Sequence, residues 1–239
     1  MKLSSLNKGL VAHWTMSQDS LKGSLLADKT PYENDGTIYG ATFTTDRKGK
    51  ANSAMYFDGV DDYIDCGNKI DYNLANTSHT ISFWANAIGV PTFTQHLLNC
   101  FTGGIPGAGY AFYINTTGII RYEERATDNS VSMSYSFSGL FGSWHFILVT
   151  VNNNDKIAKF YIDGNFINSD IYAGDLINYN NNLYIGGVRA SNYFNGSIDD
   201  VRIYNRALSE PEIKTLYNSY NPKIVIKTSL PKIKLYGGD

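Results

Sequence analysis

The chain has 239 residues, of which 43% are hydrophobic and 18% charged, and its 20 basic and 22 acidic side chains give a formal net charge of −2. This length suits one large domain or two small ones. The charge balance argues against a nucleic-acid binder, which needs a basic surplus, and the apolar fraction argues against a disordered chain. The 18 Tyr, 12 Phe and 22 Gly residues favour strands joined by turns.

The chain shows neither a membrane segment nor a visible targeting segment. No run approaches the roughly 18 consecutive apolar residues that a membrane helix needs, so we expect no membrane insertion. Residues 1–10 have an early lysine, Lys2, but no apolar stretch, and therefore no recognisable secretory signal. Cys66 and Cys100 are the only cysteines, and their spacing indicates neither a disulfide framework nor a zinc site.

Short alternating runs bounded by Gly, Asn and Asp predict strands through most of the chain. They fall at residues 9–16, 36–43, 53–58, 78–89, 94–101, 109–115, 118–125, 131–137, 144–151, 156–162 and 165–171. In the fourth run, Ile81 and Phe83 share one face, whereas Ser82 and Trp84 share the other. Such regularly spaced strands are typical of an all-β sandwich.

Two of these segments carry stronger signals. Residues 144–151 are apolar on both faces, which predicts a central strand that is covered on both sides. The last two runs are joined by Asp163-Gly164, a dipeptide that accepts positive φ at both turn positions. We therefore predict a hairpin there.

The pattern changes to a helix near the end of the chain. Ser209 as N-cap and Glu212 three residues later predict a capping box. Ile213, Leu216 and Tyr217 then form one apolar stripe. We expect a short helix that stops at Asn221-Pro222.

The last 19 residues differ from the rest in charge. Residues 221–239 carry four Lys and one Asp, a balance of +3, which leaves −5 for residues 1–220. We expect a domain over residues 1–220 and an extended basic arm over 221–239. Alternating Ile and Lys in this arm predict strands that pair with an edge of the same sandwich or with a neighbouring subunit.

Five local motifs occur in a recognisable order along the chain. They are DKTPYENDGTIYG at 28–40, FDGVDDYIDCG at 57–67, TISFWANA at 80–87, GSWHFILVTVNNNDKIAKFYIDG at 142–164 and NGSIDDVRIYNRALSEPEIKTLY at 195–217. Together they resemble the laminin G-like domains of the concanavalin A-like lectin/glucanase superfamily, over roughly residues 9–219. The resemblance implies a jelly-roll sandwich of two antiparallel sheets, here with one short C-terminal helix and an extended C-terminal arm.

The resemblance also implies a Ca²⁺ site at one edge of the sandwich, because the family often binds this ion there. Asp28 matches the family's early loop, Asn34 or Asp35 could add an oxygen, and Asp199 matches the first acid after the final glycine. Ca²⁺ accepts about six to eight oxygen ligands from separate loops. The weaker candidate ligands are Asp58, Asp61, Asp62 and Asp65.

Alternation sharpens the expectation for Asp199. It should share a strand face with Val201 and Ile203, so that a metal or a basic side chain must offset the cost of burying its carboxylate. The alternative is that Asp199 accepts backbone hydrogen bonds and that Asp28 is an Asx-turn residue.

The sequence predicts that the protein is not an enzyme. A retaining glycosidase needs two carboxylates about 5 Å apart, and the Glu-x-Asp-x-x-Glu strand of the superfamily's hydrolases is absent. Glu123-Glu124 and Asp199-Asp200 are adjacent pairs, whose members point to opposite faces of a strand. No nucleophile elbow or phosphate-binding loop occurs either.

The composition favours carbohydrate recognition, because Asn and Asp can bind sugar hydroxyls and Tyr and Trp can cover flat sugar faces. The candidate ligand-binding aromatics are Trp84, Tyr110, Tyr113, Tyr122, Tyr135 and Tyr193, and Asn181 and Asn195 are candidates at the rim. We predict a glycan- or cell-surface-recognition module in a larger extracellular or virion assembly. The alternative is a structural subunit of a virus particle, phage appendage or surface assembly, in which the arm makes contacts between copies and no glycan binds.

Overall fold

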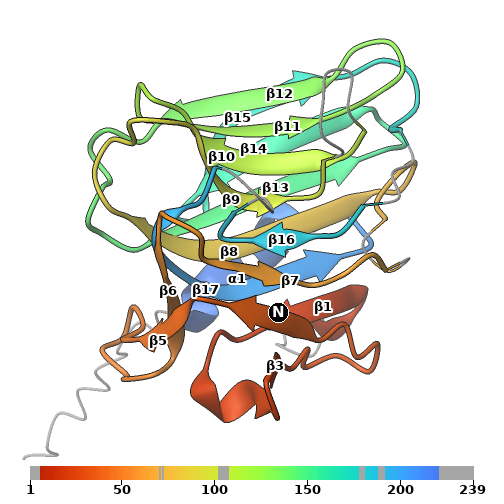
Figure 1. Cartoon of the computed structure of the whole chain (residues 1–239). Helices are drawn as coiled ribbons and strands as arrows, with labels where there is room; N and C mark the ends of the chain where they lie inside the picture. The colour runs from red at the N-terminus through yellow and green to blue at the C-terminus, as the bar shows by residue number, and fades with distance from the viewer. Residues whose placement is uncertain are drawn as a thin grey trace, which may run out of the picture.

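The computed structural model describes residues 6–69, 71, 73–101, 108–177, 181–187 and 192–220. These residues form a sandwich of two antiparallel sheets and one short α-helix near the C-terminus (Figure 1). The predicted all-β jelly-roll class is therefore confirmed. The predicted arm over residues 221–239 lies outside the described residues.

The first sheet has eight strands in the order β15-β14-β13-β8-β17-β6-β5, with β1 also paired to β17. They are β1 (Leu10–Trp14), β5 (Thr42–Thr44), β6 (Ala54–Asp58), β8 (His79–Ala87), β13 (His145–Asn152), β14 (Ile157–Ile162), β15 (Asn165–Ile171) and β17 (Asn195–Tyr204). The first half of β17 pairs with β6 and its second half with β1. This long strand thereby attaches both N-terminal strands to the sheet.

The second sheet has nine strands in the order β12-β11-β10-β9-β16-β7-β4-β3-β2. They are β2 (Leu21–Lys22), β3 (Leu25–Leu26), β4 (Gly36–Tyr39), β7 (Tyr63–Asp65), β9 (Gln95–Asn99), β10 (Tyr110–Ile114), β11 (Ile119–Glu124), β12 (Val131–Ser136) and β16 (Tyr184–Ile185). A 3-10 turn, Gln18–Ser20, precedes β2. Every pairing in both sheets is antiparallel.

The predicted single strand over residues 36–43 is wrong, because the chain crosses between sheets there. Gly40 adopts a φ of 73° and separates β4, in the second sheet, from β5, in the first. A Cβ atom at this position would lie 2.0 Å from Oδ1 of Asp62. Glycine therefore provides both the left-handed backbone and the space for the crossing.

The core lies between the sheets and follows the predicted alternation. Ile81 and Phe83 of β8 are fully buried in it, and the Phe83 ring meets Phe112 of β10 edge-on, with centroids 5.0 Å apart. The predicted hairpin is also confirmed, since Asp163 and Gly164 have φ values of 52° and 72°.

Helix α1 (Glu210–Tyr220) covers the outer face of the eight-stranded sheet, which we call the covered face. Ile213 and Leu216 pack there in a cluster with Trp84 and Phe146. The backbone N–H of Ser209 donates to the Glu212 carboxylate at 2.9 Å, as the predicted capping box requires. Among the described residues, no helix is long and apolar enough to cross a membrane.

The two cysteines are buried free thiols, in agreement with the prediction of no disulfide framework. Burial raises the pKa of Cys100 to about 12 and that of Cys66 well above its usual value. Both thiols therefore stay protonated and act as small apolar side chains.

Candidate functional site

The outer face of the nine-stranded sheet, which we call the open face, presents a cluster of tyrosines. Tyr39 of β4 and Tyr63 of β7 are opposite each other in register and stack, with ring centroids 4.6 Å apart and planes 16° apart. Tyr184 of β16 meets Tyr63 edge-on at 5.9 Å, and Tyr193 lies 6.3 Å from Tyr63. We call these four residues the tyrosine row.

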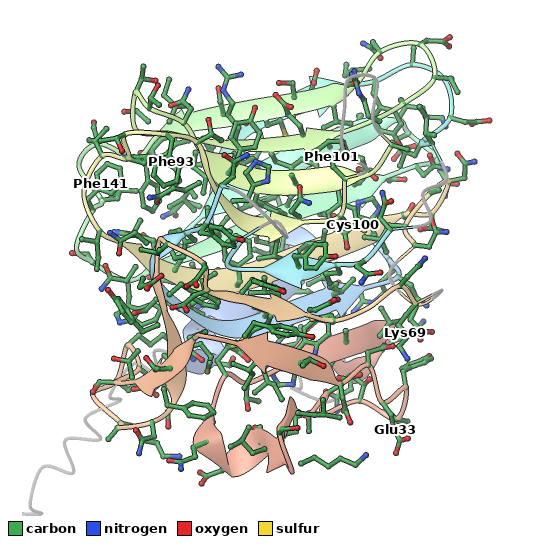
Figure 2. All side chains as sticks on the ribbon, viewed as in Figure 1. Glu33, Lys69, Phe93, Cys100, Phe101 and Phe141 are labelled. Atoms are coloured by element: carbon green, nitrogen blue, oxygen red, sulfur yellow. The ribbon has the colours of Figure 1, made fainter. Side chains whose placement is uncertain are left out.

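Helix α1 packs on the other sheet, so it does not cover this face. Figures 1 and 2 view the sandwich from the side of the nine-stranded sheet, with α1 behind. Tyr39 is 45% exposed, whereas Tyr63, Tyr184 and Tyr193 are half-buried by their contacts with one another. The row is therefore accessible to solvent at Tyr39, whereas the Tyr63 ring is held in place by contacts with Tyr184 and Tyr193.

Alternation within the strands explains the row. Ile64 of β7 is fully buried in the core, so Tyr63 and Asp65 on either side of it point outward. Ile185 of β16 is likewise buried, which turns Tyr184 outward. The two-residue strand β16 is too short to show a periodic pattern, and this explains why sequence reasoning missed Tyr184.

A second aromatic pair lies further along the open face. His96 of β9 stacks on Tyr113 of β10, with centroids 5.4 Å apart and planes 19° apart. The Tyr113 hydroxyl donates to Glu123 at 2.6 Å, and Nδ1 of His96 lies 3.0 Å from Oδ1 of Asn99. Burial lowers the pKa of His96, which favours the neutral imidazole at pH 7.

Polar groups lie beside these rings. The side-chain amide of Asn182 donates to both oxygens of Asp65, at 3.0 and 3.1 Å. Asn99 is 1% exposed, and its side-chain nitrogen has no hydrogen-bond partner within the described ranges. Flat rings next to a few fixed donors and acceptors can bind a ligand that has both apolar and hydroxylated faces.

The structure divides the six predicted ligand aromatics. Tyr113 and Tyr193 belong to the open face, whereas Tyr110 and Tyr122 are fully buried between the sheets. Tyr110, Tyr113 and Tyr122 therefore do not line one sheet face. Tyr110 and Tyr113 are three residues apart, and positions an odd number apart on a regular strand point to opposite faces.

The other two predicted aromatics also lie away from the open face. Trp84 is 3% exposed beneath α1, where its ring stacks on Tyr217 at 5.8 Å. Tyr135 of β12 is 36% exposed, but it pairs with Ile120 and so belongs to the inward side of an edge strand. Asn181, predicted at the rim, instead donates to the backbone oxygens of Cys100 and Ala108 at 3.1 and 3.2 Å.

Asp28 organises the early loop through protein hydrogen bonds. Its carboxylate accepts the backbone N–H groups of His13, Thr30 and Asn34 at 2.8, 2.9 and 3.0 Å, and the Thr30 hydroxyl at 2.6 Å. The Asn34 amide donates to the Val11 carbonyl at 3.0 Å, and its buried Oδ1 has no hydrogen-bond partner in the described part of the chain. Asp28 therefore has the geometry of an Asx-turn residue, and the Ca²⁺ site at this loop stays a prediction.

The expected orientation of Asp199 is wrong, because β17 contains a bulge. Asp200 adopts a φ of 53°, and the pairing of β17 with β8 shifts between Asp199 and Arg202. Val201 and Ile203 consequently fill the core, while Asp199 points to the covered face. The extra residue reverses the alternation on which the expectation rested.

A basic side chain, which was one of the two expected partners, accompanies Asp199. The Arg47 guanidinium contacts the Asp199 carboxylate and also lies 4.8 Å from the centroid of the Trp84 ring. Burial raises the pKa of Asp199 to about 8, and Arg47 opposes this shift. The pair therefore lies in a largely dry site at the edge of the aromatic packing.

Asp58, the fourth predicted metal ligand, lies in an acidic loop. The carboxylates of Asp58, Asp61 and Asp62 have oxygens within 4.8 Å of one another. Oδ2 of Asp62 accepts the backbone N–H of Asp58 at 2.9 Å, and burial raises the pKa of Asp62. Asp28, Asp58 and Asp199 thus have separate sets of hydrogen-bond partners.

The adjacent acids Glu123 and Glu124 point in opposite directions, as predicted. Glu123 lies on the open face with Tyr113, whereas Glu124 is fully buried. Glu124 accepts the Tyr122 hydroxyl at 2.8 Å and lies 3.3 Å from Nε2 of His79. The two carboxylates therefore cannot flank one glycosidic bond.

A family model described as the concanavalin A-like lectin/glucanases superfamily matches residues 57–214. The chain is 27% identical over 177 residues to a non-toxic nonhemagglutinin of Paraclostridium bifermentans, and 23% identical over 180 residues to non-toxic nonhemagglutinin type A of Clostridium botulinum (strain Kyoto / Type A2). These matches cover 72% and 68% of this chain but only 14% and 15% of the curated relatives.

Solved binding domains of other proteins share the fold. The binding domain of Paraclostridial Mosquitocidal Protein 1 superposes with a TM-score of 0.70 at 19% identity, over 89% of this chain and 52% of that one. The receptor binding domain of botulinum neurotoxin D gives 0.70 at 18% identity, over 90% and 54%. The serotype G binding domain gives 0.70 at 16%, over 89% and 51%. The chain thus spans about half of each solved domain.

Proposed function

Since the chain belongs to the concanavalin A-like lectin/glucanases superfamily, we propose that it is a non-catalytic recognition module that binds a glycan across its open face. The observation that carries this proposal is the tyrosine row. Four rings from distant parts of the chain meet on the one sheet face that α1 does not cover.

The chemistry of the open face supports a sugar ligand. A sugar ring has a C–H face that can pack on Tyr39 and Tyr63, and hydroxyl groups that can bond to Asp65, Glu123 or Asn99. The stacked rings hold one another in place, so less conformational entropy is lost on binding. Arg121 pairs with Tyr113 across β10 and β11, so the open face has a basic group in addition to Asp65 and Glu123, which favours a ligand of low net charge.

The similar proteins support the coarser part of the proposal. The solved structures described above are named as binding or receptor binding domains, two of them from botulinum neurotoxins, and the curated relatives are named as non-toxic nonhemagglutinins. We propose that this chain likewise recognises a receptor or glycan outside the cell, as one part of a larger assembly.

Ca²⁺ is a separate part of the proposal. Among the predicted ligands, Asp58 has the most suitable surroundings, because Asp61 and Asp62 add carboxylate oxygens within 4.8 Å. The carboxylates of Asp28 and Asp199 already have protein partners, so they would support the ion less directly. Oδ1 of Asn34, which has no hydrogen-bond partner within the described residues, is a further oxygen that we propose as a ligand of the ion.

A glycan array, run with and without EDTA, tests the proposal. We expect Tyr39→Ala and Tyr113→Ala to weaken binding about tenfold, because each removes one ring from the platform. Tyr32→Ala is the matched control, since Tyr32 is 50% exposed and belongs to the early loop. Equal binding by all three variants, or no binding by the unaltered protein, would contradict the proposed site; a loss in EDTA would support the Ca²⁺ part.

The alternative role as a structural subunit has one observation in its favour. Strand β15 is an edge strand, and its Phe166 and Ile171 side chains are 51% and 70% exposed. Another copy could cover this edge. Light scattering of the full chain, of a variant lacking 221–239 and of Phe166→Ser would test it, and an unchanged monomeric mass in all three would count against a homo-oligomer.

A further inference from the structure

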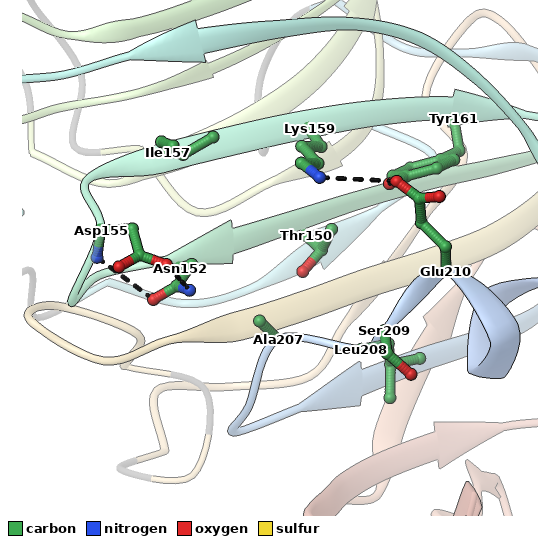
Figure 3. Close-up of a pocket in the computed structure, with 10 residues that line it drawn as sticks. All are labelled: Thr150, Asn152, Asp155, Ile157, Lys159, Tyr161, Ala207, Leu208, Ser209 and Glu210. Carbon is green, nitrogen blue, oxygen red and sulfur yellow. Dashed lines mark hydrogen bonds and ion pairs between the residues drawn. The ribbon is translucent and has the colours of Figure 1, made fainter.

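The covered face contains a small cavity where α1 begins (Figure 3). Its volume is about 210 Å³, and it is lined by Thr150, Asn152, Asp155, Ile157, Lys159, Tyr161, Ala207, Leu208, Ser209 and Glu210. This is smaller than the roughly 300–1,000 Å³ clefts that hold drug-sized ligands. The cavity therefore suits a ligand of about one ring.

Two neighbouring strands form the floor of this cavity. In the β13–β14 pairing, Thr150 is opposite Lys159 and Asn152 is opposite Ile157. Val149 and Val151 point into the core, so Thr150 between them must point outward. The floor is consequently polar at its centre although the surrounding strands are strongly apolar.

A segment from the end of the chain forms the wall. Thr80, which pairs with Thr150 across β8 and β13, donates its hydroxyl to the Arg206 carbonyl at 2.8 Å and accepts the Leu208 N–H at 2.9 Å. Arg206 also donates two hydrogen bonds to Glu212, at 3.0 and 2.8 Å. The wall is thereby fixed before any ligand arrives.

Thr150 provides an independent sign of a ligand. Only 5% of Thr150 is exposed, and its buried hydroxyl has no hydrogen-bond partner within the described residues. Burying an unpaired hydroxyl is unfavourable, and valine would fill the same space without that cost. A ligand hydroxyl in the cavity would supply the missing bond.

The rim offers both donors and acceptors. The Lys159 ammonium and the Tyr161 hydroxyl lie 3.5 and 3.4 Å from the same oxygen of Glu210, contacts long enough to be exchanged for a ligand. Burial, with a smaller effect of Glu210, raises the pKa of Tyr161 to about 12, so its hydroxyl remains a donor. At the other end, the Asn152 amide bonds to Asp155 at 2.5 Å.

We propose that this cavity binds one neutral polyhydroxylated ring, of the size of a single sugar residue. Two carboxylates and one ammonium give the lining a net charge of −1, which opposes a phosphate or carboxylate ligand. Alternating donors and acceptors suit neighbouring hydroxyl groups, and Ile157, Ala207 and Leu208 can contact the C–H face. The site lies on the sheet opposite the open face, so it goes beyond the proposed function and does not depend on it.

Methyl NMR of the full chain tests this site directly. The probes are the methyl pyranosides of glucose, galactose and mannose, with inorganic phosphate as the anionic comparison. We expect at least one pyranoside to shift the methyl signals of Ile157 and Leu208, and phosphate to leave them unchanged. Absence of pyranoside shifts at these methyl groups, or a response to phosphate alone, would overturn the proposal.

Two threonine variants separate ligand binding from folding. Thr150→Val should bind the pyranoside about tenfold more weakly, because it removes one hydrogen bond, yet it should keep or raise the urea midpoint. Thr42→Val, at an exposed position of β5, should change neither. Unchanged affinity in Thr150→Val, or a lowered midpoint, would overturn the assignment. Tyr39→Ala should leave the pyranoside-induced shifts of the Ile157 and Leu208 methyl signals unchanged. Loss of glycan binding at the open face and loss of pyranoside binding in the cavity can therefore be told apart.

Discussion

The two outer faces of the sandwich carry similar side chains but differ in what lies over them. On the covered face, Trp84 and Phe146 have centroids 5.4 Å apart and pack against Tyr217 of α1. On the open face, Tyr39 and Tyr63 stack as closely, but α1 does not lie over them. An aromatic residue on a strand is therefore structural or available for binding according to what covers it.

The largest expected loss of stability comes from a substitution at the centre of the covered face. Trp84→Ala should lower the free energy of unfolding by about 3–5 kcal/mol, because it leaves a cavity between the sheet and α1. Urea unfolding followed by circular dichroism measures the change. A loss below about 1 kcal/mol would show that the helix adds little to this packing.

A second effect on the covered face depends on pH. The pKa of Asp199 rises from 3.8 to about 8 on folding, so the folded state holds a proton that the unfolded state releases. The free energy of unfolding should fall as the pH rises from about 4 to about 8, and the contact with Arg47 should reduce the size of this change. Asp199→Asn should remove this slope, and identical pH profiles for the two proteins would contradict the assignment.

A smaller effect on the same face has the opposite sign. Hydrogen bonds from Arg206, and then from Ser209, lower the pKa of Glu212 to about 2. The stabilisation that the ionised Glu212 gives the folded state is present above pH about 4.5 and is lost as the pH falls toward 2. Glu212→Gln should cost about 1.5–3 kcal/mol at pH 7 and flatten the acid limb of the stability curve. Pro211→Ala is a control that keeps the carboxylate; an acid limb unchanged by Glu212→Gln would refute this role.

The smallest effect on stability is expected on the open face. Tyr39→Ala removes one cross-strand pair, which is worth about 0.2–1 kcal/mol. Paired with the glycan measurement above, a small change in unfolding free energy and a clear loss of affinity would mark Tyr39 as a binding residue. A loss comparable to that of Trp84→Ala would instead make the tyrosine row structural.

Local patterns predicted most of the elements. The β8 alternation placed Ile81 and Phe83 in the core and Trp84 outside it, and Asp163-Gly164 marked the hairpin. The bulge at Asp200 escaped prediction because Asp accepts a positive φ without requiring it, and no glycine or other turn residue follows Asp200 as Gly164 follows Asp163. One such residue reverses the alternation of every position after it. The sequence did not bring Tyr39, Tyr63 and Tyr184 together, since they come from three short strands far apart in the chain.

The sequence by itself determined the strands, the turns, the capped helix and the membership of a lectin-like superfamily, because these depend on side chains a few residues apart. Tertiary structure decided which tyrosines are uncovered and which polar groups line the cavity. Both depend on where residues 206–220 pack against a sheet formed much earlier in the chain. Such packing follows from the fit of whole surfaces, which no local spacing records.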